Sequence, residues 1–196
     1  MKRLAFFSFA VLTLALLNSC EETSFDLDIP IEYTITKNVE IPGNVSASEI
    51  TDTNFFDADV DPDLKKNLDK VSSLEVEQIL IDISNLNIID SLAFVKAKAE
   101  ASLRKEDPIS EVVFIHPLLN SNNEFTTLEE IENTKPIVIS GADINVNGIS
   151  DVLEDLKSGK GAYFITTYTG ENQTSKTYTF DAVITIKFKA VATIEE

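Results

Sequence analysis

The sequence predicts an all-β protein, mainly an antiparallel β-sandwich, with two or three short helices. Much of the chain after residue 24 alternates apolar and polar residues with a period of two, which is typical of half-buried strands. These stretches are short, turn residues separate them, and the helical patterns between them are brief. Many short strands with few helices favour two packed sheets, and a closed barrel is the competing architecture.

The first strand is expected over residues 25 to 36, where every second residue is apolar. Pro30 has no amide hydrogen to donate, so this strand should lie at a sheet edge or at a bulge. Residues 38 to 59 are rich in Ser, Thr, Asn and Asp, and they are interpreted as a long loop. The apolar face of the first strand consists of Phe25, Leu27, Ile29, Ile31, Tyr33 and Ile35.

A short helix is expected next, with Asp61 as its N-cap and Pro62 at its first position, ending near Ser72. In the following strand the apolar parity changes near Gln78, which a β-bulge would produce. Residues 93 to 103 are expected to form a strand because five apolar residues alternate with polar ones. The rival is a helix, which alanine and lysine favour. The alternating apolar residues are Val95, Ala97, Ala99, Ala101 and Leu103.

The middle of the chain predicts two brief strands and a helix. Apolar residues over 111 to 115 and over 137 to 139 indicate the strands. Thr127 and Glu130 have the spacing of a capping box, in which each residue caps the backbone of the other at a helix start.

The last part of the chain predicts a helix followed by a hairpin. The helix covers residues 150 to 157, with Ser150 as its cap and Gly159 as its terminator. A strand over residues 161 to 169, a turn over 170 to 175 and a long strand over 176 to 193 complete the sheets. On the last strand one face carries Tyr178, Phe180, Ala182, Ile184, Ile186, Phe188 and Ala190.

The first twenty residues have the composition of an export signal. A basic start is followed by an uncharged apolar run from residue 4 to residue 17, too short to cross a bilayer comfortably. The run closes on Leu17-Asn18-Ser19-Cys20, which resembles the lipobox of bacterial lipoproteins. The resemblance implies cleavage before Cys20 and acylation of this cysteine, with several chains forming a strong membrane anchor. The alternative is an ordinary secreted protein that is cut elsewhere.

The predicted organisation is a signal peptide over residues 1 to 19, an acylated cysteine with a short tether over 20 to 24, and a single β-sandwich domain over 25 to 196. The acidic residues after Cys20 resemble the surface-export signals of some Gram-negative lipoproteins. Position 21 is Glu21, so the aspartate that retains some lipoproteins in the inner membrane is absent there. We therefore expect the outer membrane, with the domain facing the periplasm or the cell surface.

Charge and cysteine content exclude several classes of function. Removal of residues 1 to 19 takes away two of the 16 basic residues and leaves 14 against 33 acidic ones, a formal charge of −19. Nucleic acid is therefore not expected as a partner, because phosphate binding requires clustered Lys and Arg. Cys20 is the only cysteine and is assigned to the lipid, so disulfides, thiolate catalysis and cysteine-bound metals are not expected.

The sharpest candidate ligand site is the segment over residues 143 to 154. Oxygen-bearing side chains stand at its positions one, three, five, nine and twelve, with Gly148 at position six. This spacing resembles an EF-hand calcium loop, in which alternate side chains converge on one ion and the last glutamate is bidentate. The resemblance implies that the calcium ligands are Asp143, Asn145, Asn147, Asp151 and Glu154.

The flanks of this segment differ from the EF-hand pattern. Position eight is Ser150 instead of an aliphatic residue, and Pro136 and Gly141 forbid a regular entering helix. The alternative is a strand with Ile144 and Val146 facing inward, a turn at Asn147-Gly148, and a helix capped by Ser150.

Other candidates are weaker. A second acidic cluster has Pro62 and Leu68 where an EF-hand needs Gly and Glu, so it is interpreted as a solvated loop that leads into an N-cap. His116 is the only histidine and no nucleophile-elbow sequence is present, so no catalytic triad is expected. The chain has no tryptophan to stack on a sugar ring. The acidic cluster consists of Asp57, Asp59, Asp61 and Asp63.

These observations predict a lipid-anchored envelope protein that is a non-catalytic binding or structural module at the outer membrane. Its partners would be the membrane, through the lipid, and a protein or glycan of the cell envelope. No cofactor is expected apart from the calcium of the candidate loop. Two alternatives stay open: a calcium-dependent surface adhesion or assembly subunit, and a carrier of an apolar ligand such as a lipid. An enzyme is least favoured, because no cluster combines a nucleophile, a base and an orienting group.

Overall fold

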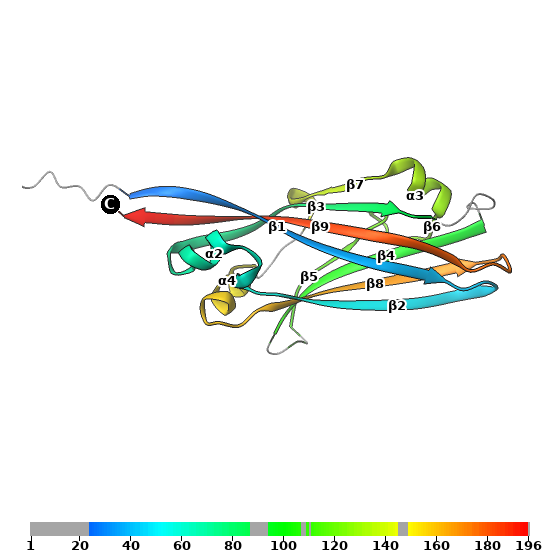
Figure 1. The fold of residues 1–196 in the computed structure, drawn as a ribbon, viewed down its shortest axis with the longest axis horizontal. Helices are drawn as coiled ribbons and strands as arrows, with labels where there is room; N and C mark the ends of the chain where they lie inside the picture. The colour runs from blue at the N-terminus through cyan, green and yellow to red at the C-terminus, as the bar shows by residue number, and fades with distance from the viewer. Residues whose placement is uncertain (1–23, 87–93, 107–108, 110, 145–148, 196) are drawn as a thin grey trace, which may run out of the picture.

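The computed structural model describes residues 24–86, 94–106, 109, 111–144 and 149–195. Their strands form two antiparallel sheets that pack face to face, which confirms the all-β sandwich (Figure 1). The first sheet has the order β1-β9-β3-β7, and the second has the order β2-β8-β4-β5, with β6 also paired to β4. Both sheets have open edges, so the competing closed barrel is not formed.

The described strands range from two to eighteen residues. The first sheet contains β1 (Ser24–Ile41), β9 (Tyr178–Glu195), β3 (Val71–Ser84) and β7 (Ile137–Ser140). The second sheet contains β2 (Val45–Phe56), β8 (Ala162–Asn172), β4 (Val95–Lys105), β5 (Val112–Pro117) and β6 (Thr126–Thr127). The helices are α2 (Pro62–Asn67), α3 (Leu128–Thr134) and α4 (Ile149–Lys157), and short 3-10 turns are η1 (Ala58–Val60), η2 (Leu68–Lys70) and η4 (Gly141–Asp143).

The core lies between the sheets and consists of the inward faces that alternation predicted. The ring of Phe56 on β2 stacks on Phe188 on β9, with 4.9 Å between the centroids, so the core contacts span both sheets. All seven residues predicted to share one face of the last strand are buried. Burial of apolar surface on this scale is the main stabilising contribution to such a fold.

β1 confirms the first predicted strand and the role of Pro30. The strand pairs with β9 at an edge of the first sheet, which is the position where proline is tolerated in a strand. Ile29 and Ile31 are buried, as expected for the apolar face, but Phe25 and Leu27 on the same face are exposed.

The long loop expected over residues 38 to 59 is wrong. β1 continues to Ile41, a turn follows, and β2 covers Val45–Phe56 as an edge strand of the second sheet. The alternation is masked because one face of β2 is in solvent while its partly buried face carries Asp52 and Asn54. Polar residues on both faces are typical of loops, and here they belong to a strand held by its neighbour β8.

Two strand predictions are confirmed in detail. The register of β3 against β9 shifts between Val76 and Gln78, at the position where the apolar parity changes. The segment that alanine and lysine left ambiguous is the strand β4, and its five alternating apolar residues are all buried. Alternation therefore outweighed intrinsic helix propensity, since the buried face determines the element.

The helix ends follow the predicted capping chemistry with some corrections. The Asp61 side chain accepts hydrogen bonds from two backbone amides at the start of α2, and Thr127 and Glu130 form the capping box of α3. However, α2 ends at Asn67 and β3 already begins at Val71.

The C-terminal elements also depart slightly from their predicted bounds. Ser150 lies inside α4, which begins at Ile149, and so it is not the cap. Gly159 follows α4 with a φ of 77°, as a terminator should. β8 extends to Asn172, so the connection to β9 is shorter than the predicted turn.

The two ends of the sandwich differ. Ser24 at the start of β1 pairs with Glu195 at the end of β9, and α2 and α4 lie toward this end, here called the terminal end (Figure 1). The β1–β2 and β8–β9 turns lie together at the opposite, distal end, where the Asn44 amide donates to the Thr174 carbonyl at 2.7 Å.

Candidate functional site

A groove lies along β3 where its short neighbour β7 stops. β7 pairs only with residues 78 to 81 of β3, and the chain then turns away at Gly141. The backbone of Gly141 passes so close to β3 that an added Cβ atom would lie 1.9 Å from the Val76 carbonyl oxygen. A glycine is required there, and β3 on the N-terminal side of its bulge has no strand partner on this edge within the described residues.

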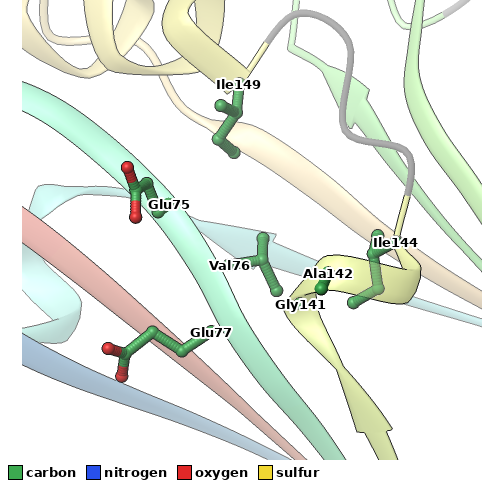
Figure 2. A pocket seen from close by; sticks show the side chains of 7 residues that line it. All are labelled: Glu75, Val76, Glu77, Gly141, Ala142, Ile144 and Ile149. Carbon is green, nitrogen blue, oxygen red and sulfur yellow. The ribbon is translucent and has the colours of Figure 1, made fainter.

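We call this depression the β3 groove (Figure 2). Its volume is about 560 Å³. The apolar side chains of the lining lie on the side of the Gly141 turn, whereas the carboxylates of Glu75 and Glu77 lie on the opposite side and point away from that turn (Figure 2). The lining residues are Glu75, Val76, Glu77, Gly141, Ala142, Ile144 and Ile149.

The groove carries negative charge beside apolar surface. The ammonium of Lys189 on β9 donates to Asp28 at 2.8 Å, and this bond raises the pKa of Lys189, with Glu77 and Glu75 adding to the effect. Lys189 is therefore paired principally with Asp28, and both glutamates are exposed. The lining residues include no histidine, cysteine, serine or lysine, and their ionisable groups are the carboxylates of Glu75 and Glu77.

A second, polar depression lies on the outer face of the second sheet. Its volume is about 310 Å³. The segment between β5 and β6 closes one side of it, where the Asn123 amide donates to Glu100 at 3.2 Å. It is lined by Glu49, Lys98, Ala99, Glu100, Asn123, Thr167 and Thr169, a set rich in hydrogen-bonding groups.

The predicted calcium ligands are only partly described. Asp143 ends η4 and is exposed, while Asp151 and Glu154 lie on α4. Asn145 and Asn147 lie outside the described residues. In the described ranges no three carboxylate, histidine or cysteine side chains are grouped as metal ligands would be, and the calcium site stays a prediction.

Two of these residues take part in ion pairs. The Glu154 carboxylate lies 3.2 Å from the Lys157 ammonium, one helical turn away. Asp151 lies 3.9 Å from Lys105, whose ammonium also lies 3.4 Å from Glu111. Burial opposes the charge on Lys105, but the surrounding carboxylates outweigh it and raise its pKa.

The Lys105 cluster joins the end of β4 to α4 and was not predicted. Its carboxylates come from two segments far apart in the chain, the residues just before β5 and the helix α4, so no local pattern shows it. Asp155 completes the cluster at 3.9 Å, and one of its oxygens is buried without a hydrogen-bond partner among the described residues.

A polar cluster between β1 and β2 was also missed. The Lys37 ammonium donates to Asp52 at 2.9 Å, and the Asn54 amide donates to the other carboxylate oxygen at 2.7 Å. Burial alone would raise the pKa of Asp52, but these hydrogen bonds outweigh it and hold the pKa below its ordinary value. Nearby on β8, burial raises the pKa of Tyr168, whose hydroxyl has no described partner.

The remaining candidates have structural roles. Asp57 and Asp61 cap η1 and α2, and Asp59 forms an ion pair with Lys65, so the acidic cluster leads into a helix cap as interpreted. His116 lies on β5, where its Nδ1 is 2.6 Å from the Pro117 carbonyl oxygen.

Cys20, the residue predicted to carry the lipid, lies outside the described residues. Within the described part of the chain, no helix is both long enough and apolar enough to cross a membrane.

Comparisons with known proteins yield no family. No family model matches the chain, and no curated protein matches it. Among solved structures, a decameric BFDV capsid protein is 8% identical with a TM-score of 0.42, covering 84% of this chain and 99% of that one. The VP2 subviral particle of infectious bursal disease virus is 9% identical with a TM-score of 0.38, covering 85% of this chain and 37% of that one. Turnip yellow mosaic virus gives 6% identity, a TM-score of 0.35, and coverage of 89% and 96%.

These values are too low to carry an argument about function or ancestry. The class of the protein, a two-sheet antiparallel sandwich, rests on the strand pairing itself.

Proposed function

We propose that the protein is a lipid-anchored envelope module, non-catalytic, that binds a partner or supports a structure close to the outer membrane. The observation that carries the proposal is the lipobox ending in Cys20, only four residues before β1 begins at Ser24. At 3.3 to 3.6 Å per residue this distance is about 14 Å at most. An acylated Cys20 would therefore hold the terminal end of the sandwich at the membrane and direct the distal end away from it.

The surfaces left for a partner are open depressions. The β3 groove offers apolar and carboxylate side chains, and the depression on the second sheet offers hydroxyl, amide and charged groups. A protein or glycan partner fits such open surfaces. The lipid-carrier alternative is less favoured, because Phe56 and Phe188 stack between the sheets and a ligand there would have to displace them.

The test is metabolic labelling with an alkyne fatty acid, comparing the full-length protein with Cys20→Ala. We expect label in the wild type, recovery in the outer-membrane fraction, and loss of both in the variant. Protease added to intact cells then separates a surface-facing domain from a periplasmic one. An unlabelled wild type, or a Cys20→Ala variant that is still recovered in the outer-membrane fraction, would contradict the proposal.

A further inference from the structure

The terminal end carries a two-stranded ribbon that extends past the rest of its sheet. β3 pairs with β9 no further than Val71 opposite Ala192. Beyond that point β1 and β9 still pair with each other, through Phe25 opposite Ile194 to the last described pair. In Figure 1 this ribbon projects beyond α2 and α4.

One face of the ribbon is apolar and uncovered. The side chains of Phe25 and Leu27 are 50% and 39% exposed, although Ile29 on the same face of β1 is only 3% exposed. Ile194 across from Phe25 is half-buried. We define Phe25, Leu27 and Ile194 as the terminal patch.

The other face of the ribbon is acidic, and its charges have partners. The Thr193 hydroxyl donates to Asp26 at 3.0 Å, and the Lys189 ammonium donates to Asp28 at 2.8 Å. The ribbon is therefore amphipathic, with its carboxylates on the face opposite the terminal patch. The patch itself can approach a low-dielectric surface without desolvating them.

The chain length before β1 indicates what covers the patch. The reach from Cys20 to Ser24, about 14 Å at most, exceeds the headgroup layer of a bilayer, about 5 to 8 Å thick on each side, by less than about 10 Å. An acylated cysteine sits at this layer, so the ribbon cannot leave its neighbourhood. Exposed aromatic and aliphatic side chains at this depth gain from contact with the acyl boundary.

We propose that the terminal patch docks into the interfacial layer of the bilayer that holds the lipid anchor. The lipid then fixes the position of the domain and the patch fixes its orientation. This inference rests on the proposed acylation of Cys20.

The chain has no tryptophan, so one substitution creates a unique fluorescent probe. Phe25→Trp places the probe in the patch, and Phe94→Trp is the matched control. Phe94 is 58% exposed, and its carbonyl accepts a hydrogen bond from the Gln173 amide beside the distal turn. The acylated full-length mature proteins are reconstituted into phosphatidylcholine vesicles with or without brominated acyl chains, and co-flotation is measured on the same samples.

We expect brominated lipid to reduce the Phe25→Trp emission at least twofold and to leave the Phe94→Trp emission unchanged. Co-flotation with equal emission from both variants would overturn the docking and leave the anchor intact. A blue shift of Phe25→Trp that depends on protein concentration but not on brominated lipid would overturn it in favour of a second copy. Loss of co-flotation would refute the anchor itself, and the docking with it.

Discussion

Gly141 offers the most direct test of the close approach that forms the β3 groove. An alanine Cβ there would lie 1.9 Å from the Val76 carbonyl oxygen and 2.8 Å from the Glu77 carbonyl oxygen. Both are backbone atoms, so no side chain can rotate away to make room. Either the turn at η4 or the bulge of β3 has to move by about 1 Å or more to restore a normal contact.

The expected cost follows from this displacement. Overpacking costs about 1 to 3 kcal/mol, and separation of Ser140 from Gln78 at the end of the β7 pairing adds about 1 kcal/mol for a lost hydrogen bond. We therefore expect Gly141→Ala to lower the free energy of unfolding by about 3 kcal/mol.

Gly159→Ala is the matched control, because it isolates the other reason for glycine. Gly159 has a φ of 77° and no atom within 4 Å of an added Cβ, so the expected cost is only the left-handed backbone, about 1 kcal/mol. Urea unfolding measures both variants. With a slope of about 2 kcal/mol per molar, Gly141→Ala should lower the midpoint by about 1.5 M and Gly159→Ala by about 0.5 M.

The reasoning would be refuted by a Gly141→Ala midpoint within about 0.3 M of the wild type, since typical slopes would convert this shift to well under 1 kcal/mol. A larger loss for Gly159→Ala than for Gly141→Ala would refute it equally, because backbone conformation would then outweigh the clash.

Three further predictions concern local interactions. Thr127→Ala removes half of the capping box with Glu130 and should cost about 1 kcal/mol in urea unfolding, whereas a change under 0.3 kcal/mol would mean that the cap does not stabilise α3. Asp52 has a lowered pKa in the folded state, so its ion pair with Lys37 stabilises the protein above the ordinary pKa of the carboxyl and is lost as the pH falls through the folded pKa. Asp52→Asn should therefore lower the free energy of unfolding by about 1 kcal/mol at pH 7 and by less with each step below pH 4. A cost that is constant with pH would contradict this linkage. If the loop at Asp143 holds calcium, a calcium concentration about one hundred times Kd should stabilise the protein by about 2.7 kcal/mol relative to chelator in thermal unfolding. Asp143→Ala should abolish this gain. Identical unfolding in calcium and in chelator would show that the loop is not a calcium site.

The parts of the fold that the sequence predicted are those in which one buried face determines the pattern. The change of parity at Gln78 located the bulge of β3, because every inward residue on either side must still reach the core. Asp61 located the start of α2, because capping depends on neighbouring residues alone.

The parts that were missed depend on partners far away in the chain. β2 has a partly buried face with Asp52 and Asn54, and this face is tolerable only because Lys37 arrives from β1. The ammonium of Lys105 similarly lies near the carboxylate of Glu111, just before β5, and near two carboxylates of α4. No local periodicity reports such contacts.

The candidate site was unpredictable for a similar reason. Glu75 and Glu77 show only that one face of β3 is exposed. The groove beside them exists because Gly141, more than sixty residues later, passes against the carbonyl of Val76. In the sequence, Gly141 indicated only that a regular helix could not precede the candidate calcium loop. Its close approach to the backbone of β3 depends on the path of β7, which the sequence alone does not give.

The pairing of β1 with β9 also constrains how the protein is made. The register joins the first described residue, Ser24, to the last, Glu195, and β9 lies between β1 and β3 in the sheet. The first strand to emerge during synthesis therefore has no partner until the last eighteen-residue strand has been produced. Contacts of such long sequence separation form slowly, because closure of the intervening chain must precede them. Folding of the first sheet is thus delayed until β9 has been produced, and a chain that ends before Tyr178 leaves β1 and β3 without the strand that joins them.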